Sequence, residues 1–152
     1  MIKEAEAVRL KKWIDKAEKK GAKILIGGNL EGVFLDPTLL ENVDAKLEIY
    51  KDEAFGPIAI LEKFKKFEQG IATINQSRFG LQAGIYTQNL NHMLYAWDHL
   101  HVGGVIINDV PTFRVDNMPY GGVKDSGLGR EGIHSAIRDM QEERLLAIKE
   151  LS

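Results

Sequence analysis

The chain has 152 residues, of which 44% are hydrophobic and 28% charged, with a formal net charge of −2 and no cysteine. We expect a single domain over residues 1–152 and no nucleic acid or membrane as a partner, because the length suits one core and the charge is near neutral. The absence of an apolar run of roughly 20 residues, of a signal-peptide pattern and of cysteine excludes a membrane span, disulfides and thiol nucleophiles within this sequence, and we expect a cytoplasmic protein.

The first part of the chain is predicted to contain one long helix and several short strands. Residues 3–20 carry apolar side chains near helical spacing, and Gly21 stands where a C-terminal cap is expected. Short strands are expected over 23–26, 33–35 and 58–61, each next to glycine or proline. Residues 39–50 are ambiguous.

From residue 58 onward, predicted strands and helices alternate. Apolar spacing predicts helices over 66–76, 90–100 and 133–140, and strands over 81–87 and 105–107. This rhythm favours an α/β sheet with right-handed crossovers. Residues 144–148 are predicted as a last strand, which pairs either with the chain's own sheet or outside this subunit.

The stretch from Val105 to Gly132 is the first candidate for part of a functional site. A short buried strand leads into a long connection rich in glycine, and long ordered connections often carry functional side chains. Such glycines indicate backbone that passes close to another group or takes a positive φ. Residues 127–132 match G-x-G-x-x-G, but no strand precedes them, so a glycine-rich turn before a helix is favoured over a dinucleotide fingerprint.

The turn at residues 53–57 is the second candidate. Pro57 keeps Gly56 out of the α region, so the turn presents Glu53 and Phe55 from the edge of a strand. A carboxylate and an aromatic ring presented together could hold a ribose and cover a flat heterocycle. A capping glutamate and a core phenylalanine are the alternative, which spacing alone favours.

Three side chains of the long connection have two interpretations each. Arg114 could receive a substrate carboxylate or phosphate, or form an ion pair with Asp109 or Asp116. Phe113 and Tyr120 could line an apolar substrate tunnel, or pack beneath the loop.

Four segments in sequence order carry a family resemblance: GAKILIGG at 21–28, EAFGP at 53–57, the stretch 75–87 containing FGL, and 118–132, which follows Asn108 after a strand. Together they resemble the GAKxLxGG, ExFGP, N…YGL.AG.(F/Y)T and PFGGxKxSGxGREG motifs of the C-terminal portion of the aldehyde dehydrogenase superfamily. The resemblance extends over nearly the whole chain. It implies an α/β fold: part of the catalytic domain, a mostly parallel sheet with flanking helices, and a terminal oligomerisation strand over about residues 141–152.

The resemblance also implies an activity, the NAD(P)+-dependent oxidation of an aldehyde to a carboxylic acid through a thiohemiacetal on a cysteine. Glu53 would bind the nicotinamide ribose hydroxyls, and Phe55 would pack near the nicotinamide. Arg114 would suit an acidic or phosphorylated aldehyde. The expected substrate-binding residues are Asn108, Phe113, Arg114 and Tyr120.

The resemblance implies that the catalytic centre would lie upstream of this chain. This part of the family comprises the catalytic cysteine, the general-base glutamate, the oxyanion-hole asparagine and the Rossmann region. We therefore expect no catalytic residue and no metal site in it, weak or no binding of NAD or NADP, and no aldehyde oxidation by the chain alone. A homo-oligomer, a dimer or larger, is expected because apolar surface would be exposed. The alternatives are a free-standing, non-catalytic interaction module of the same fold and a remnant without a specific role.

Overall fold

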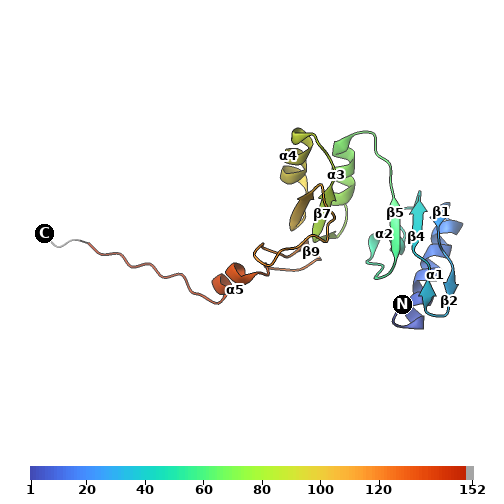
Figure 1. The fold of residues 1–152 in the computed structure, drawn as a ribbon, viewed down its shortest axis with the longest axis horizontal. Coiled ribbons are helices and arrows are strands. Elements are labelled where there is room, and N and C mark those ends of the chain that lie inside the picture. The colour runs from blue at the N-terminus through green and yellow to red at the C-terminus, as the bar shows by residue number, and fades with distance from the viewer. Residues whose placement is uncertain (150–152) are drawn as a thin grey trace. The chain divides into compact units, whose positions relative to one another are not determined.

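The computed structural model describes residues 1–149 and divides into two compact units, Met1–Lys65 and Lys66–Ser152 (Figure 1). Each unit has its own cluster of buried apolar side chains. That the two units together form the single domain expected over residues 1–152 stays a prediction. Among the described helices, none is long and apolar enough to cross a membrane.

The first unit consists of a three-stranded sheet, a hairpin and two helices. In chain order they are α1 (Glu4–Lys19), β1 (Lys23–Ile26), β2 (Leu30–Glu31), β3 (Phe34–Leu35), β4 (Thr38–Glu41), α2 (Glu48–Lys51) and β5 (Ile58–Leu61). Strand β4 is central, antiparallel to β1 and parallel to β5, while β2 and β3 form the hairpin. The predicted first helix and the strands at 23–26 and 58–61 are confirmed, and the ambiguous residues 39–50 contain most of β4 and most of α2.

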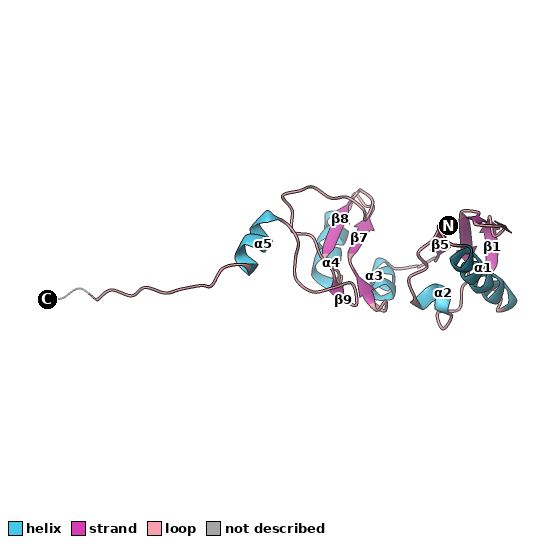
Figure 2. Ribbon diagram, turned by 90° about the horizontal axis from the view of Figure 1, so that it is seen from below, coloured by secondary structure: helices cyan, strands magenta, loops and turns pink. Residues whose placement is uncertain are grey.

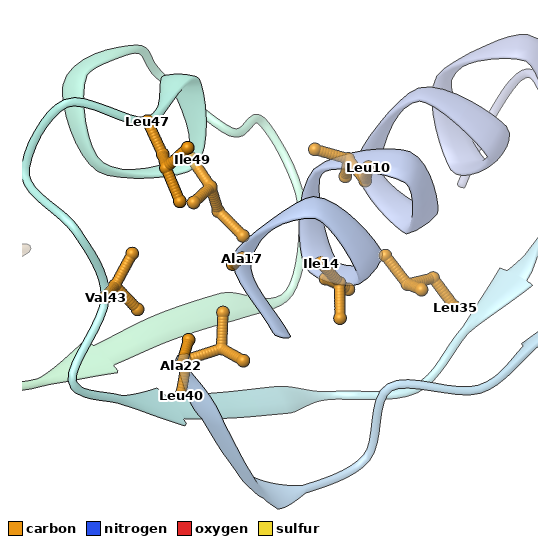
Figure 3. Packing of buried hydrophobic residues seen from close by; sticks show 9 residues of the cluster. All are labelled: Leu10, Ile14, Ala17, Ala22, Leu35, Leu40, Val43, Leu47 and Ile49. Carbon is orange, nitrogen blue, oxygen red and sulfur yellow. The ribbon is translucent and has the colours of Figure 1, made fainter. Parts of the chain in front are cut away.

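Helix α1 packs through one apolar stripe onto the sheet. Leu10 and Ile14 are fully buried, and Leu40 of β4 is buried with them. Figure 3 shows these side chains in one cluster that α2 also joins. The helix ends in a Schellman arrangement, in which Gly21 (φ 100°) and Ala22 donate to the carbonyls of the last turn over 2.9 and 3.0 Å.

An ion pair also links the two helices of the first unit. Lys16 of α1 donates to both carboxylate oxygens of Glu48 of α2, over 2.7 and 2.8 Å. This hydrogen bond is the main reason why the pKa of Glu48 lies below its ordinary value. Both side chains are half exposed, so the pair contributes little to stability compared with the apolar cluster.

The second unit is built around two parallel strands with a helix between them in sequence. Its elements are α3 (Phe67–Asn75), β6 (Phe79–Gly80), β7 (Gln82–Ile85), α4 (Leu90–His99), β8 (Gly104–Ile107), β9 (Val123–Lys124) and α5 (Ile133–Asp139). Strands β7 and β8 lie side by side in parallel, and β6 pairs with β9 in antiparallel fashion (Figure 2). The core includes Ile71 of α3, Ile85 of β7 and Ala96 of α4.

The mostly parallel sheet is found only in part. The pairs β4–β5 and β7–β8 are parallel, but β1–β4, β2–β3 and β6–β9 are antiparallel, and the strands belong to separate sheets. The alternation predicted from residue 58 onward is found as far as α5, with the two-residue strands β6 and β9 in addition, but β5 pairs with β4 and lies in the first unit.

The last strand expected over residues 144–148 does not form in the described chain. Residues 141–149 have no regular secondary structure, and their side chains, including Leu145, Leu146 and Ile148, are exposed. Pairing of 144–148 with the chain's own sheet is therefore wrong for this structure, because an extended segment without a neighbouring strand cannot satisfy a ladder of hydrogen bonds. Residues 150–152, which belong to the expected terminal strand, lie outside the described residues.

Candidate functional site

Asn108 joins the carboxyl ends of the two parallel strands of the second unit. It directly follows β8 in a left-handed conformation (φ 59°), which asparagine tolerates better than most residues. Its backbone N–H donates to the Ile85 carbonyl over 2.8 Å, and its Oδ1 accepts from the Thr87 N–H over 2.8 Å. Ligands of parallel sheets bind at the edge formed by the carboxyl ends of the strands. Asn108 therefore fixes the start of the following loop at an edge where a ligand could bind.

The loop that follows lies on strand β7. A Cβ on Gly84 would be 2.7 Å from the Asp109 carbonyl oxygen, so the strand approaches the loop where it has no side chain. Gln82, two residues earlier, donates from Nε2 to the carbonyls of Pro111 and Phe113 over 2.9 and 3.0 Å. Phe113 is 42% exposed, so it is not packed away beneath the loop.

Arg114 lies on the ring of Tyr120. The guanidinium carbon is 4.3 Å from the ring centroid, and Nη2 is 3.2 Å from a carboxylate oxygen of Glu131. The backbones of Tyr120 and Glu131 pair with each other in an antiparallel bridge. An ion pair with Asp109 or Asp116 is one of the two interpretations of Arg114, and the structure forms the ion pair with Glu131 instead. The arginine side chain stays 46% exposed.

The glycines of this region permit close backbone contacts, as the sequence predicted. A Cβ on Gly103 would overlap the Gly121 carbonyl oxygen, and a Cβ on Gly121 would be 2.7 Å from the Gly129 carbonyl oxygen. Gly127, Gly129 and Gly132 have φ of 131°, 73° and 115°, and α5 begins directly afterwards. Residues 127–132 are therefore a glycine-rich turn before a helix, the interpretation that the sequence favoured.

Glu53 and Phe55 lie in the first unit, in the turn between α2 and β5. Arg9 of α1 donates to the Ala54 carbonyl over 2.9 Å, and a Cβ on Gly56 would overlap the Leu10 side chain, so the turn is held against α1. Phe55 has φ 53° and 79% exposure. The interpretation of Phe55 as a core residue is wrong, and Glu53, which follows the end of α2, does not cap its N-terminus.

The predicted site residues fall into two groups, one in each unit. Asn108, Phe113, Arg114 and Tyr120 share the loop of the second unit, whereas Glu53 and Phe55 share the turn of the first. Sequence reasoning missed two contacts, Glu131 with Arg114 and Gln82 with the loop backbone; the only signal was that both lie within the quoted family motifs. No group of three or more His, Cys, Asp or Glu within residues 1–149 is placed to hold a metal ion.

The sequence profile of the aldehyde dehydrogenase family matches residues 1–146 of this chain. The chain is also 42% identical to 3-sulfolactaldehyde dehydrogenase of Priestia aryabhattai over 148 residues. That match covers 97% of this chain and 31% of the relative, so the chain spans about a third of the relative's length.

Two solved structures resemble the fold over most of its length. Aldehyde dehydrogenase 21 from Physcomitrella patens, in complex with the reaction product succinate, gives a TM-score of 0.90 at 46% identity, covering 93% of this chain and 30% of that one. The glyceraldehyde-3-phosphate dehydrogenase GapN from Methanocaldococcus jannaschii, complexed with NADP, gives 0.85 at 39% identity, covering 92% and 30%.

Proposed function

Because the chain belongs to the aldehyde dehydrogenase family, we propose that it forms the C-terminal part of an NAD(P)+-dependent oxidoreductase that converts an aldehyde to a carboxylic acid. Its relatives extend over about three times its length. We assign the nucleophilic cysteine, the general base and the Rossmann region to the part of the enzyme outside this sequence, since the 152 residues contain no cysteine.

In this proposal the turn of the first unit faces the coenzyme. The Glu53 carboxylate accepts hydrogen bonds from vicinal ribose hydroxyls, and the exposed ring of Phe55 covers the nicotinamide. The strained, left-handed backbone at an exposed phenylalanine supports this role, because such conformations concentrate at ligand sites. When bound, NAD+ or NADP+ accepts a hydride from the substrate; this chain contributes too few contacts to bind either coenzyme tightly by itself.

The loop of the second unit would form the substrate side. Asn108 holds the loop to the sheet, and the half-exposed ring of Phe113 offers an apolar wall. Arg114 has five N–H donors, and among the described residues its ion pair with Glu131 engages one of them. The remaining edge of the guanidinium, which lies over the ring of Tyr120, is suited to a bidentate anion.

We therefore propose an aldehyde that carries a carboxylate, sulfonate or phosphate. The observation that carries this proposal is the pre-positioned, half-exposed guanidinium of Arg114. The relatives named above agree with it, since 3-sulfolactaldehyde, succinate and glyceraldehyde 3-phosphate all carry an anionic group. The enzyme is proposed to be a cytoplasmic homo-oligomer, a dimer or larger, with the exposed apolar side chains of residues 141–149 paired against another copy.

Replacement of Arg114 tests the substrate class. In the enzyme that contains this chain, Arg114→Met should raise KM for succinic semialdehyde by about 10- to 100-fold, the usual value of a hydrogen-bonded charge pair. KM for butanal, which replaces the carboxylate with a methyl group, should stay within about two-fold, because a neutral aldehyde gains nothing from the guanidinium. Initial rates of NADPH or NADH formation give both constants.

Two further variants define the control for this experiment. Arg114→Lys keeps the charge but loses the bidentate geometry, so its KM should lie between those of the wild type and Arg114→Met. Arg138→Met removes an arginine of α5 outside the proposed site and should change neither constant. Equal effects of Arg114→Met on both aldehydes would refute the anionic substrate.

A further inference from the structure

Strand β7 turns two of its residues toward the loop. Ala83 and Ile85 are buried in the core of the second unit, so Gln82 and Gly84 lie on the opposite face. The loop contacts this face directly, because a Cβ on Gly84 would meet the Asp109 carbonyl oxygen at 2.7 Å. The position of the loop therefore depends on what β7 presents there.

The only long side chain that β7 presents to the loop is the amide of Gln82. Its Nε2 donates to the carbonyls of Pro111 and Phe113 over 2.9 and 3.0 Å, and the Phe113 N–H donates to the Val110 carbonyl over 3.1 Å to close a turn. Arg114 is the next residue. Two carbonyl acceptors require two donors, so the amide nitrogen faces the loop and the amide oxygen faces away.

The oxygen of the same amide is poorly used. Gln82 Oε1 is buried and has no hydrogen-bond partner among the described residues. An unpaired buried acceptor opposes folding. The benefit of an amide at this position must therefore come from the two hydrogen bonds that its nitrogen donates. The Gln82 side chain fits here because its register partner on β8 is Gly104, which has no side chain. A Cβ on Gly104 would be 3.2 Å from the Gln82 Cγ.

We propose that Gln82 is a positioning residue that fixes Phe113 and Arg114 above β7 and thereby sets the affinity for the anionic end of the substrate. The effect on substrate affinity rests on the proposed function, whereas the anchoring of the loop by Gln82 does not. Gln82 does not touch the reacting atoms; it acts through the Pro111 and Phe113 carbonyls that flank the turn.

The anchoring is tested in the 152-residue chain by amide hydrogen exchange at Phe113, whose N–H closes the turn. In Gln82→Met, a side chain of similar length without donors, the protection factor should fall at least about 10-fold. The urea midpoint should change little, because the substitution also removes the unpaired buried oxygen. Gln88→Met, at an exposed glutamine, is the matched control and should leave the protection factor unchanged.

A pH profile separates anchoring by donated hydrogen bonds from a space-filling role. Gln82→Glu keeps the shape but places a carboxylate against two carbonyl oxygens, so protection should be lost at pH 7. In acid the introduced carboxyl carries a proton and donates one hydrogen bond, so part of the protection should return in Gln82→Glu and not in Gln82→Met. Unchanged protection in Gln82→Met, or a flat profile in Gln82→Glu, would overturn the proposal.

The substrate role is measured separately in the enzyme that contains this chain. Gln82→Met should raise the ratio of KM for succinic semialdehyde to KM for butanal several-fold, with kcat for butanal retained. A loss of protection at Phe113 without a change in this ratio would reduce Gln82 to a structural residue and overturn its positioning role. If Arg114→Met also left the ratio unchanged, the proposed substrate class would be the part that fails, and the anchoring would still stand on the exchange data.

Discussion

Gly103→Ala is expected to destabilise the second unit by about 3 kcal/mol or more, in the upper range of overpacking substitutions. A Cβ at this position would overlap the Gly121 carbonyl oxygen and lie 3.0 Å from the Leu81 carbonyl oxygen. The Gly103 N–H already donates to the Gly80 and Leu81 carbonyls over 3.0 and 2.9 Å, so the residue is held from both sides. All of these atoms are backbone, and no flexible side chain can give way.

The effect is measured by urea unfolding together with hydrogen exchange at the Asn108 amide, which is bonded to the Ile85 carbonyl inside the second unit. Gly129→Ala is the matched control. A Cβ there would meet no atom within 4 Å, so that variant carries only the cost of φ 73° for an alanine, about 1 kcal/mol. Equal losses in the two variants would show that the close approach of Gly103 and Gly121 does not hold the segment in place.

The regular elements of this chain could be predicted because their signals are local. Helices α1, α3 and α4 and strands β1, β5 and β8 agree with the predicted segments to within a few residues, since each carries its own apolar period. Strands β2, β6 and β9 have two residues each, which is too short for any period to appear. Which strands would pair could not be predicted, because pairing depends on how the connections fold.

The candidate site shows the same division between local and long-range signals. The sequence motifs indicate which residues belong to the site, but spacing offers only the neighbours Asp109 and Asp116 as ion-pair partners of Arg114. The partner is Glu131, 17 residues away, because the chain folds back to pair Tyr120 with Glu131. For Phe55, spacing alone favours a core residue over a presented ring, because spacing cannot indicate the positive φ with which the structure exposes it.

The second prediction with a large effect is a complete absence of activity: we expect the 152-residue chain to oxidise no aldehyde on its own. The family's covalent chemistry requires a cysteine, and this sequence has none. Loss of the nucleophile alone lowers kcat by roughly 10⁶-fold in an enzyme with a covalent intermediate. The purified chain, with NAD+ or NADP+ and succinic semialdehyde, should therefore give the same absorbance change at 340 nm as a blank. Turnover that survives repurification would refute the assignment of the nucleophile to another part of the enzyme.

The size of the native gene product in source cells tests the central proposal most directly. An antibody raised against this chain should detect a band roughly three times larger than 17.0 kDa, because the chain spans 31% of a relative that it matches over 97% of its own length. Such a band would place the turn at Glu53 and the loop at Arg114 in one aldehyde dehydrogenase. A single band at 17.0 kDa would contradict the proposal and favour the free-standing, non-catalytic module.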